Sequence, residues 1–152
     1  MKSDILEEIN NKISTFCINK IDVKEQSQEL FFKLRCSEDI INIAKIIKEF
    51  NGRCITIDIY KNHDDNVLLY HFDIKNILIT IETTLKNKTI ISLSNVLKST
   101  VWIERELSQQ YSINFSGHSN MKKVFLDKSM SKTVLNEYLT LSEIMTNKDL
   151  KG

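Results

Sequence analysis

Three extended segments between residues 53 and 85 constrain the fold of this chain most strongly. Residues 53–60 alternate in polarity, which predicts a strand with Ile55, Ile57 and Ile59 on one face. Two further apolar runs, residues 67–74 and 77–85, follow after short polar turns. Three such segments in succession predict an antiparallel meander, whose apolar face other elements must cover.

Helical patterns surround the meander. Apolar residues recur at helical spacing over residues 4–16 and 40–50, and residues 29–35 read as a strand between them. Ser37 is the expected N-cap of the second helix, and Asn51-Gly52 its expected stop. With a helix over residues 96–111, the order is α-β-α-β-β-β-α. This order predicts an α+β domain with a mainly antiparallel sheet of about four strands and helices packed on one face.

Length and composition indicate one globular domain. The chain has 152 residues, of which 41% are hydrophobic and 27% charged. Its net charge of +1 argues against nucleic-acid binding through bulk electrostatics. It has no apolar run of the roughly 18 residues that would span a bilayer, so we expect a cytoplasmic chain without direct membrane insertion. We expect a core domain over residues 1–126 and a polar tail over residues 127–152, either packed locally as a helix or ordered by a partner.

Metal and cofactor signals are weak. The three cysteines, Cys17, Cys36 and Cys54, form no C-x-x-C pair, which favours reduced, buried thiols over an iron–sulfur cluster. His63-Asp64-Asp65 lies in a predicted turn, where these residue types are common. His71 and Asp73 share a strand face but have no third ligand nearby in the sequence. We therefore expect no metal and no cofactor bound by this chain.

The segment after the meander carries the clearest functional signal. Residues 96–111, with Ser94 as the expected cap, form a helix with an apolar stripe. Trp102 falls roughly opposite this stripe, and Glu104 falls inside it. Each position alone has an ordinary explanation, because Trp102 can fold back over long side chains and Glu104 can reach the edge of the stripe or meet a buried partner. Together they suggest a helix covered on two sides, by the core of its own domain and by another protein. Trp and Arg are the residues that most often anchor such interfaces.

The same segment carries a family resemblance. It reads Trp102-x-Glu104-Arg105-Glu106, followed by Tyr111-x-Ile113-x-Phe115-x-Gly117-His118. This resembles the signature of the thirty-kilodalton (C) subunit of respiratory complex I and of the related subunits of energy-converting nickel–iron hydrogenases and formate hydrogenlyases. The family pattern is W-x-E-R-E-x-x-D-hydrophobic-aromatic-G-I-x-F-x-G-H-P-D/N-L. Among its departures from this pattern are Gln109, Ser112, Ser119 and Met121.

The resemblance implies an α+β domain that serves as a non-catalytic accessory subunit of a membrane-associated redox complex. It implies two partners, namely a large subunit with the nickel–iron or quinone site and a subunit with iron–sulfur clusters. It also implies a peripheral position on the inner face of the cell membrane. The short chain favours the hydrogenase or hydrogenlyase type over complex I itself. The implied docking residues are Trp102, Glu104, Arg105, Glu106, Tyr111, Phe115, Gly117 and His118.

Two alternatives remain open from the sequence. One is a stand-alone adaptor that has kept the fold and lost its redox partner. The other is a small enzyme in which Glu104 and His118 act as an acid–base pair. An enzyme requires a concave site around these two groups, whereas a docking subunit should expose Trp102 when it is alone.

Overall fold

A computed structural model describes residues 2–21, 29–63 and 65–122. The polar tail predicted for residues 127–152 and the domain boundary at residue 126 lie outside these residues. No helix among the described residues has the length and apolar character needed to cross a membrane.

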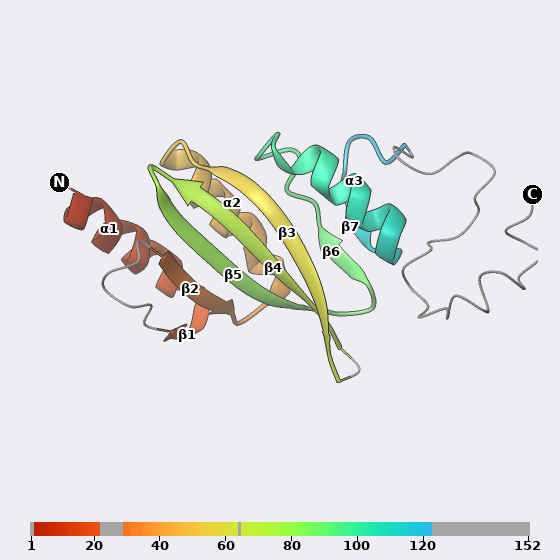
Figure 1. Ribbon diagram of the computed structural model, residues 1–152, viewed down its shortest axis with the longest axis horizontal. Coiled ribbons are helices and arrows are strands. Elements are labelled where there is room, and N and C mark those ends of the chain that lie inside the picture. Colours follow the sequence, from red (N-terminus) through yellow and green to blue (C-terminus); the bar gives the residue numbers. More distant parts are fainter. Residues whose placement is uncertain (1, 22–28, 64, 123–152) are drawn as a thin grey trace, which may run out of the picture.

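The described residues form a five-stranded sheet in which only one neighbouring pair is parallel (Figure 1). In sheet order its strands are β1 (Cys17–Ile21), β2 (Glu29–Leu34), β5 (Ile77–Leu85), β4 (Asp65–Ile74) and β3 (Arg53–Asn62). Strands β3, β4 and β5 form the predicted meander, and β2 pairs with β5 in parallel. The α+β class is therefore confirmed. Strand β1 was not predicted, so the sheet has one strand more than expected.

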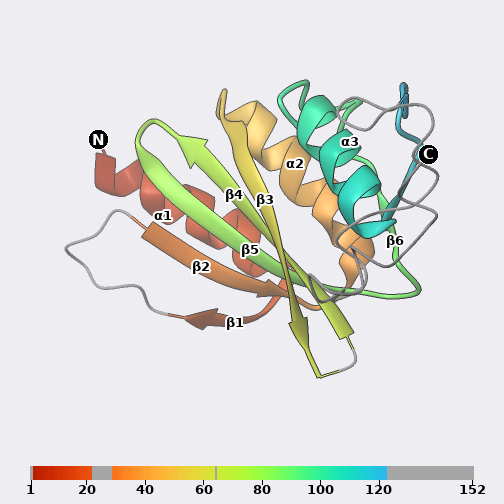
Figure 2. The ribbon, with the colours of Figure 1, turned by 45° about the vertical axis from the view of Figure 1, so that its right-hand side comes forward.

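Two helices cover one face of this sheet (Figure 2). They are α1 (Lys2–Ser14) and α2 (Ile40–Glu49), and α2 follows a 3-10 turn, η1 (Ser37–Asp39). Ile9 and Ile13 of α1 and Ile43 and Ile47 of α2 are fully buried and belong to the same core as the inward side chains of the strands. Burial of these apolar side chains is the main force that holds the helices to the sheet.

Strand β3 departs from the strict alternation that its sequence predicts. The pairing with β4 shifts between Cys54 and Thr56, which is the sign of a β-bulge. Because the bulge adds one residue, Cys54 and Ile57 point inward while Ile55 is 49% exposed. The prediction that Ile55 shares the buried face of Ile57 and Ile59 is therefore wrong.

The ends of α2 also differ in part from expectation. Ser37 is not an N-cap, because it is the first residue of the 3-10 turn η1. The Asp39 N–H closes this turn by donating to the Cys36 carbonyl. The stop at Asn51-Gly52 is confirmed, since Asn51 has a φ of 56° and the Gly52 N–H donates to Ile47 at 2.8 Å. A Cβ atom at Gly52 would lie 2.7 Å from the Ile74 side chain, so this position requires a glycine for space.

A second, smaller unit follows the meander. Strands β6 (Thr89–Ile91) and β7 (Asn114–Ser116) pair in parallel, and helix α3 (Thr100–Tyr111) lies between them in the chain and beside β3 in space (Figure 1). The helix begins later than predicted because hydrogen-bonded turns occupy residues 93–100. Ser99, not Ser94, precedes the first helical residue, and its hydroxyl accepts the Cys54 backbone N–H.

Candidate partner interface around helix α3

Helix α3 carries both of the unusual positions that its sequence predicts. Glu104 is fully buried beside Leu107, while Trp102 is 59% exposed. A buried carboxylate and an exposed tryptophan on one helix are the reverse of the usual preference. The predicted exposure of Trp102 is confirmed, and each of the two side chains needs its own physical explanation.

Glu104 is satisfied within its own chain. Its Oε1 atom accepts the backbone N–H of Leu93 at 2.7 Å, and its Oε2 atom accepts the hydroxyl of Ser92. The Ser92 hydroxyl also lies 2.8 Å from that of Ser94, so both serines belong to the same buried polar cluster. These bonds fix the turn after β6 to the middle of α3. A buried carboxylate is stable only with such partners.

His118 holds the following segment against the same helix. Its side chain is fully buried, and its Nδ1 atom accepts the backbone N–H of Asn120 at 3.0 Å. Because Nδ1 is an acceptor, the neutral ring carries its proton on Nε2, which donates to the Val101 carbonyl at 3.1 Å. The distance from Nε2 to Glu104 Oε2 is 3.8 Å. His118 thus links α3 to the chain after β7 through hydrogen bonds to Val101 and Asn120.

Burial controls the ionisation of this cluster. Removal from water raises the pKa of Glu104 to about 7, although the hydrogen bonds from Ser92, Leu93 and Thr100 oppose the shift. Burial, and then the nearby Glu104 carboxylate, raise the pKa of Cys54 to about 12. The Tyr70 hydroxyl is also buried, and it has no hydrogen-bond partner among the residues that the structure describes. The side chains of Glu104 and His118, considered above as an acid–base pair, are both fully buried.

The end of the family motif is also part of the core. Ile113 and Phe115 are 1% and 2% exposed, and Phe115 lies in β7. Gly117 has a φ of 81°, which confirms the expected backbone turn that other residues adopt with strain. Glu104, Phe115 and His118 therefore place their side chains inside this chain, where they cannot reach a partner's surface.

Trp102 is the exposed side chain of the motif, and the half-buried Arg105 lies against it. The Arg105 guanidinium carbon lies 5.0 Å from the centre of the Trp102 ring, a cation–π geometry. The same guanidinium donates through Nε and Nη2 to the Lys122 carbonyl, at 2.9 and 2.7 Å. Met121, which precedes Lys122 in the chain, is 40% exposed. We call Trp102, Arg105 and Met121 the Trp102 surface. The sequence did not predict Met121 as part of it, because no periodicity links residue 121 to the helix.

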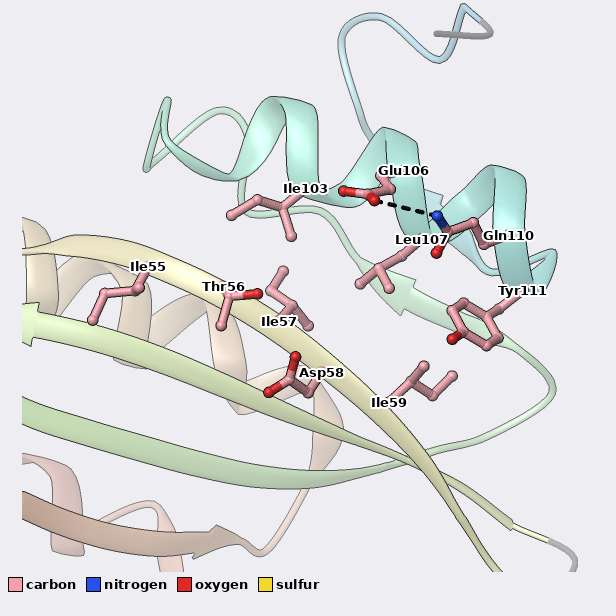
Figure 3. Close-up of a pocket in the computed structure, with 10 residues that line it drawn as sticks. All are labelled: Ile55, Thr56, Ile57, Asp58, Ile59, Ile103, Glu106, Leu107, Gln110 and Tyr111. Carbon is pink, nitrogen blue, oxygen red and sulfur yellow. Dashed lines mark hydrogen bonds between the residues drawn. The ribbon is translucent and has the colours of Figure 1, made fainter. Parts of the chain in front are cut away.

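Glu106 and Tyr111 lie on a different side of α3, along a groove between this helix and β3 (Figure 3). The Glu106 carboxylate accepts a hydrogen bond from Gln110 Nε2 at 3.2 Å. The predicted docking residues thus occupy three places: Glu104, Phe115 and His118 in the interior; Trp102, Arg105 and Gly117 on the surface; Glu106 and Tyr111 at the groove.

The weak metal signals separate in the structure. His71 contacts Asp58 at 3.2 Å and the Thr80 hydroxyl at 2.9 Å, while Asp73 faces Arg53 at 3.6 Å. His63 is exposed in its turn, and Asp64 lies outside the described residues. Within the described ranges, no three potential ligands come together. That this chain binds no metal remains a prediction.

The cysteines agree only partly with expectation. Cys17 and Cys54 are buried, as predicted, and Cys36 is exposed. All three are free thiols in the structure. Burial raises the pKa of Cys17 to about 11, so this thiol, like that of Cys54, stays protonated at neutral pH.

Comparisons with known proteins agree with the motif. A family model described as respiratory-chain NADH dehydrogenase, 30 kDa subunit, matches residues 35–141. The fold is similar to a chain in the structure of the membrane-bound sulfane sulfur reductase, an archaeal respiratory membrane complex. The TM-score is 0.69 at 16% identity, covering 84% of this chain and 78% of that one. It is also similar to the trypsin-resistant fragment (1–134) of Nqo5, with a TM-score of 0.54 at 15% identity, covering 78% of this chain and 98% of that one. A search of curated protein sequences gave no match.

Proposed function

This chain belongs to the family of the 30 kDa subunit of respiratory-chain NADH dehydrogenase, and on that premise we propose that it is a non-catalytic accessory subunit of a membrane-associated redox complex. Its role is to dock onto the large electron-transfer subunit and to stabilise it. The complex is of the energy-converting hydrogenase type or of the NADH:quinone oxidoreductase type.

The observation that carries this proposal is the exposure of Trp102 beneath Arg105. A tryptophan side chain offers a large apolar area, and leaving it in water forgoes the stabilisation that burial would give. The two carbonyl hydrogen bonds of Arg105 hold its guanidinium over the ring before any partner arrives. A preorganised Trp–Arg pair loses little conformational freedom on binding, which is a property of interface hot spots.

The proposed partners are the large subunit, which carries the nickel–iron or quinone site, and the subunit that holds iron–sulfur clusters. This chain contributes no cofactor ligands of its own in the proposal. In support, Cys17 lies in β1, Cys36 in the loop between β2 and η1, and Cys54 in β3, and Cys17 and Cys54 are buried. Contact with these subunits would place the chain peripherally on the inner face of the cell membrane.

Affinity purification of the tagged chain from detergent-solubilised membranes of its own source tests this function. Mass spectrometry should identify a large nickel–iron or quinone-site subunit together with an iron–sulfur subunit. The chain purified alone should contain far less than one iron, nickel or zinc atom per molecule. Recovery of the chain alone from the soluble fraction would contradict the proposal and favour the stand-alone adaptor.

A further inference from the structure

Strand β3 has an outer edge that no described residue pairs with. The sheet order places β3 at one end, where it bonds to β4 on its other side. The Cys54 N–H, at the start of the strand, is held by Ser99, and no backbone hydrogen bond from a described residue reaches the outer edge of residues 55–62. A free edge of this length is a template for another strand, and proteins usually cover or protect it.

The groove beside this edge has apolar walls. Ile57 and Ile59 of β3 point towards Ile103 and Leu107 of α3, and Tyr111 closes the far end (Figure 3). The groove holds about 570 Å³, a volume within the range of ligand-binding sites. Ile55, which lines the groove, is 49% exposed. Apolar side chains of a partner could therefore pack against it.

The groove carries negative charge. Asp58 and Glu106 are the only charged side chains among the described residues that line it. The Asp58 side chain is 61% exposed and contacts His71 at 3.2 Å. Even if His71 carries a positive charge, the two carboxylates leave the groove with a net negative charge. A ligand with a lysine or arginine side chain would find complementary charge here, whereas an acidic ligand would be repelled.

We propose that this groove binds an extended, basic segment of a partner protein, which adds as a strand to the free edge of β3. The partner's alternate apolar side chains pack against the groove residues that keep exposed surface, Ile55, Ile59 and Ile103. Its Lys or Arg side chains meet Asp58 and Glu106. Backbone hydrogen bonds provide affinity in such strand addition, and the side-chain pockets provide specificity. The inference stands apart from the Trp102 surface, which lies on another side of α3.

A second copy of this chain is a poorer occupant. Two β3 strands paired antiparallel about their centres would bring the two Asp58 carboxylates close together, because Asp58 lies near the middle of residues 53–62. Like charges in adjacent positions across a strand pair destabilise it. A second copy and the segment 123–152 of this chain are therefore alternative outcomes of the test.

The test uses the full chain labelled with ¹⁵N and a capped ten-residue peptide that alternates valine and lysine. We expect saturable binding, shifts of the amide signals of residues 55–62 and 103–111, and at least tenfold slower hydrogen exchange along the outer edge of β3. A twin peptide with glutamate in place of lysine should bind at least tenfold more weakly. Absence of saturable binding, or equal binding of the two peptides, would overturn the proposal.

Charge variants assign the binding to this groove. Glu106→Lys should weaken binding of the basic peptide at least tenfold and strengthen that of the acidic twin, and Asp58→Lys should act in the same direction. Glu38→Lys makes the same charge change on exposed η1 and should leave both affinities unchanged. An equal effect of Glu38→Lys and Glu106→Lys would show a response to net charge only, which overturns the assignment.

The exchange rates of the free chain identify other occupants. Without peptide, the outer-edge amides of β3 should exchange rapidly at every protein concentration. Protection that grows with protein concentration would show that a second copy occupies the edge. Protection that is independent of concentration would show that another part of this chain does so. Either result would contradict the proposal.

Discussion

The carboxylate of Glu104 shows that one residue of the family motif serves the fold of this chain itself. It accepts hydrogen bonds from Ser92 and Leu93, and so it joins the turn after β6 to α3. Two positions earlier, Trp102 points to solvent. The Trp-x-Glu-Arg-Glu motif thus combines an internal connection with an external surface, and substitutions at these two positions should have different consequences.

Glu104 makes the stability of the fold depend on pH. Its pKa of about 7 in the folded chain lies above the ordinary value of 4.5, so the folded state holds a proton that the unfolded state releases. The free energy of unfolding should therefore fall as the pH rises from about 4.5 to about 7, by about 3 kcal/mol for this group. Urea unfolding of the wild type and of Glu104→Gln at pH 5 and pH 8 measures this contribution. Equal pH dependence in the two proteins would contradict the assignment.

The cysteines should differ sharply in reactivity. Cys17 and Cys54 are buried with a raised pKa, and Cys36 is exposed. A thiol reagent at pH 8 should modify one cysteine per native chain rapidly and three in denaturant. In Cys36→Ser the rapid phase should disappear. Rapid modification of Cys54 in the native chain would show that the region around Glu104 is open to solvent.

At the scale of elements, the end of α3 carries strain that can be relieved. Ser112 follows the helix with φ 55° and ψ 37°, a left-handed conformation, at the position where the family pattern has glycine. Ser112→Gly should raise the free energy of unfolding by about 0.5–1 kcal/mol, because glycine adopts this conformation without a Cβ penalty. Ser108→Gly, inside the same helix, should lower it by a similar amount. Thermal or urea unfolding compares the two variants, and destabilisation by Ser112→Gly would contradict this explanation.

The elements that sequence reasoning identified are those with long, regular patterns. The meander and the amphipathic helices α1 and α2 repeat their periods over enough residues to be recognised. Strand β7 has only three residues, and its pairing with β6 joins segments far apart in the sequence. The bulge at Ile55 depends on the register with β4. Ser94 resembled a helix cap because nothing local shows that its hydroxyl belongs to the Glu104 cluster.

At the scale of the whole molecule, the sheet with α1 and α2 forms the main core, and α3 lies at its edge. Helices α1 and α2 bury one face of the sheet, while α3 lies beside the edge strand β3 (Figure 2). This position gives α3 two outward sides, one with Trp102 and one along the groove. A single short helix can therefore contact two different segments of an assembly.

Sequence reasoning found the region of the candidate interface, but it did not show that Phe115 and His118 of the motif have buried side chains. Helical periodicity alone predicts that Trp102 is opposite the apolar stripe, and the structure confirms it. The burial of Phe115 and His118 depends on how the chain returns along β6 and against α3 after the helix. Tertiary contacts of this kind leave no local pattern, so these residues looked the same as the exposed part of the motif.

The central claim is that Trp102 docks this chain onto a partner subunit, and the affinity of Trp102→Ala for the assembled complex tests it most directly. We expect this affinity to fall at least 30-fold, which corresponds to about 2 kcal/mol. The reason is that a tryptophan which a partner covers on binding contributes this much to an interface hot spot. The free energy of unfolding of the isolated chain should change by less than about 0.5 kcal/mol, as for other surface substitutions. Lys98→Ala, an exposed control just before α3, should change neither quantity. Unchanged affinity, or unfolding of the isolated Trp102→Ala chain, would contradict the account.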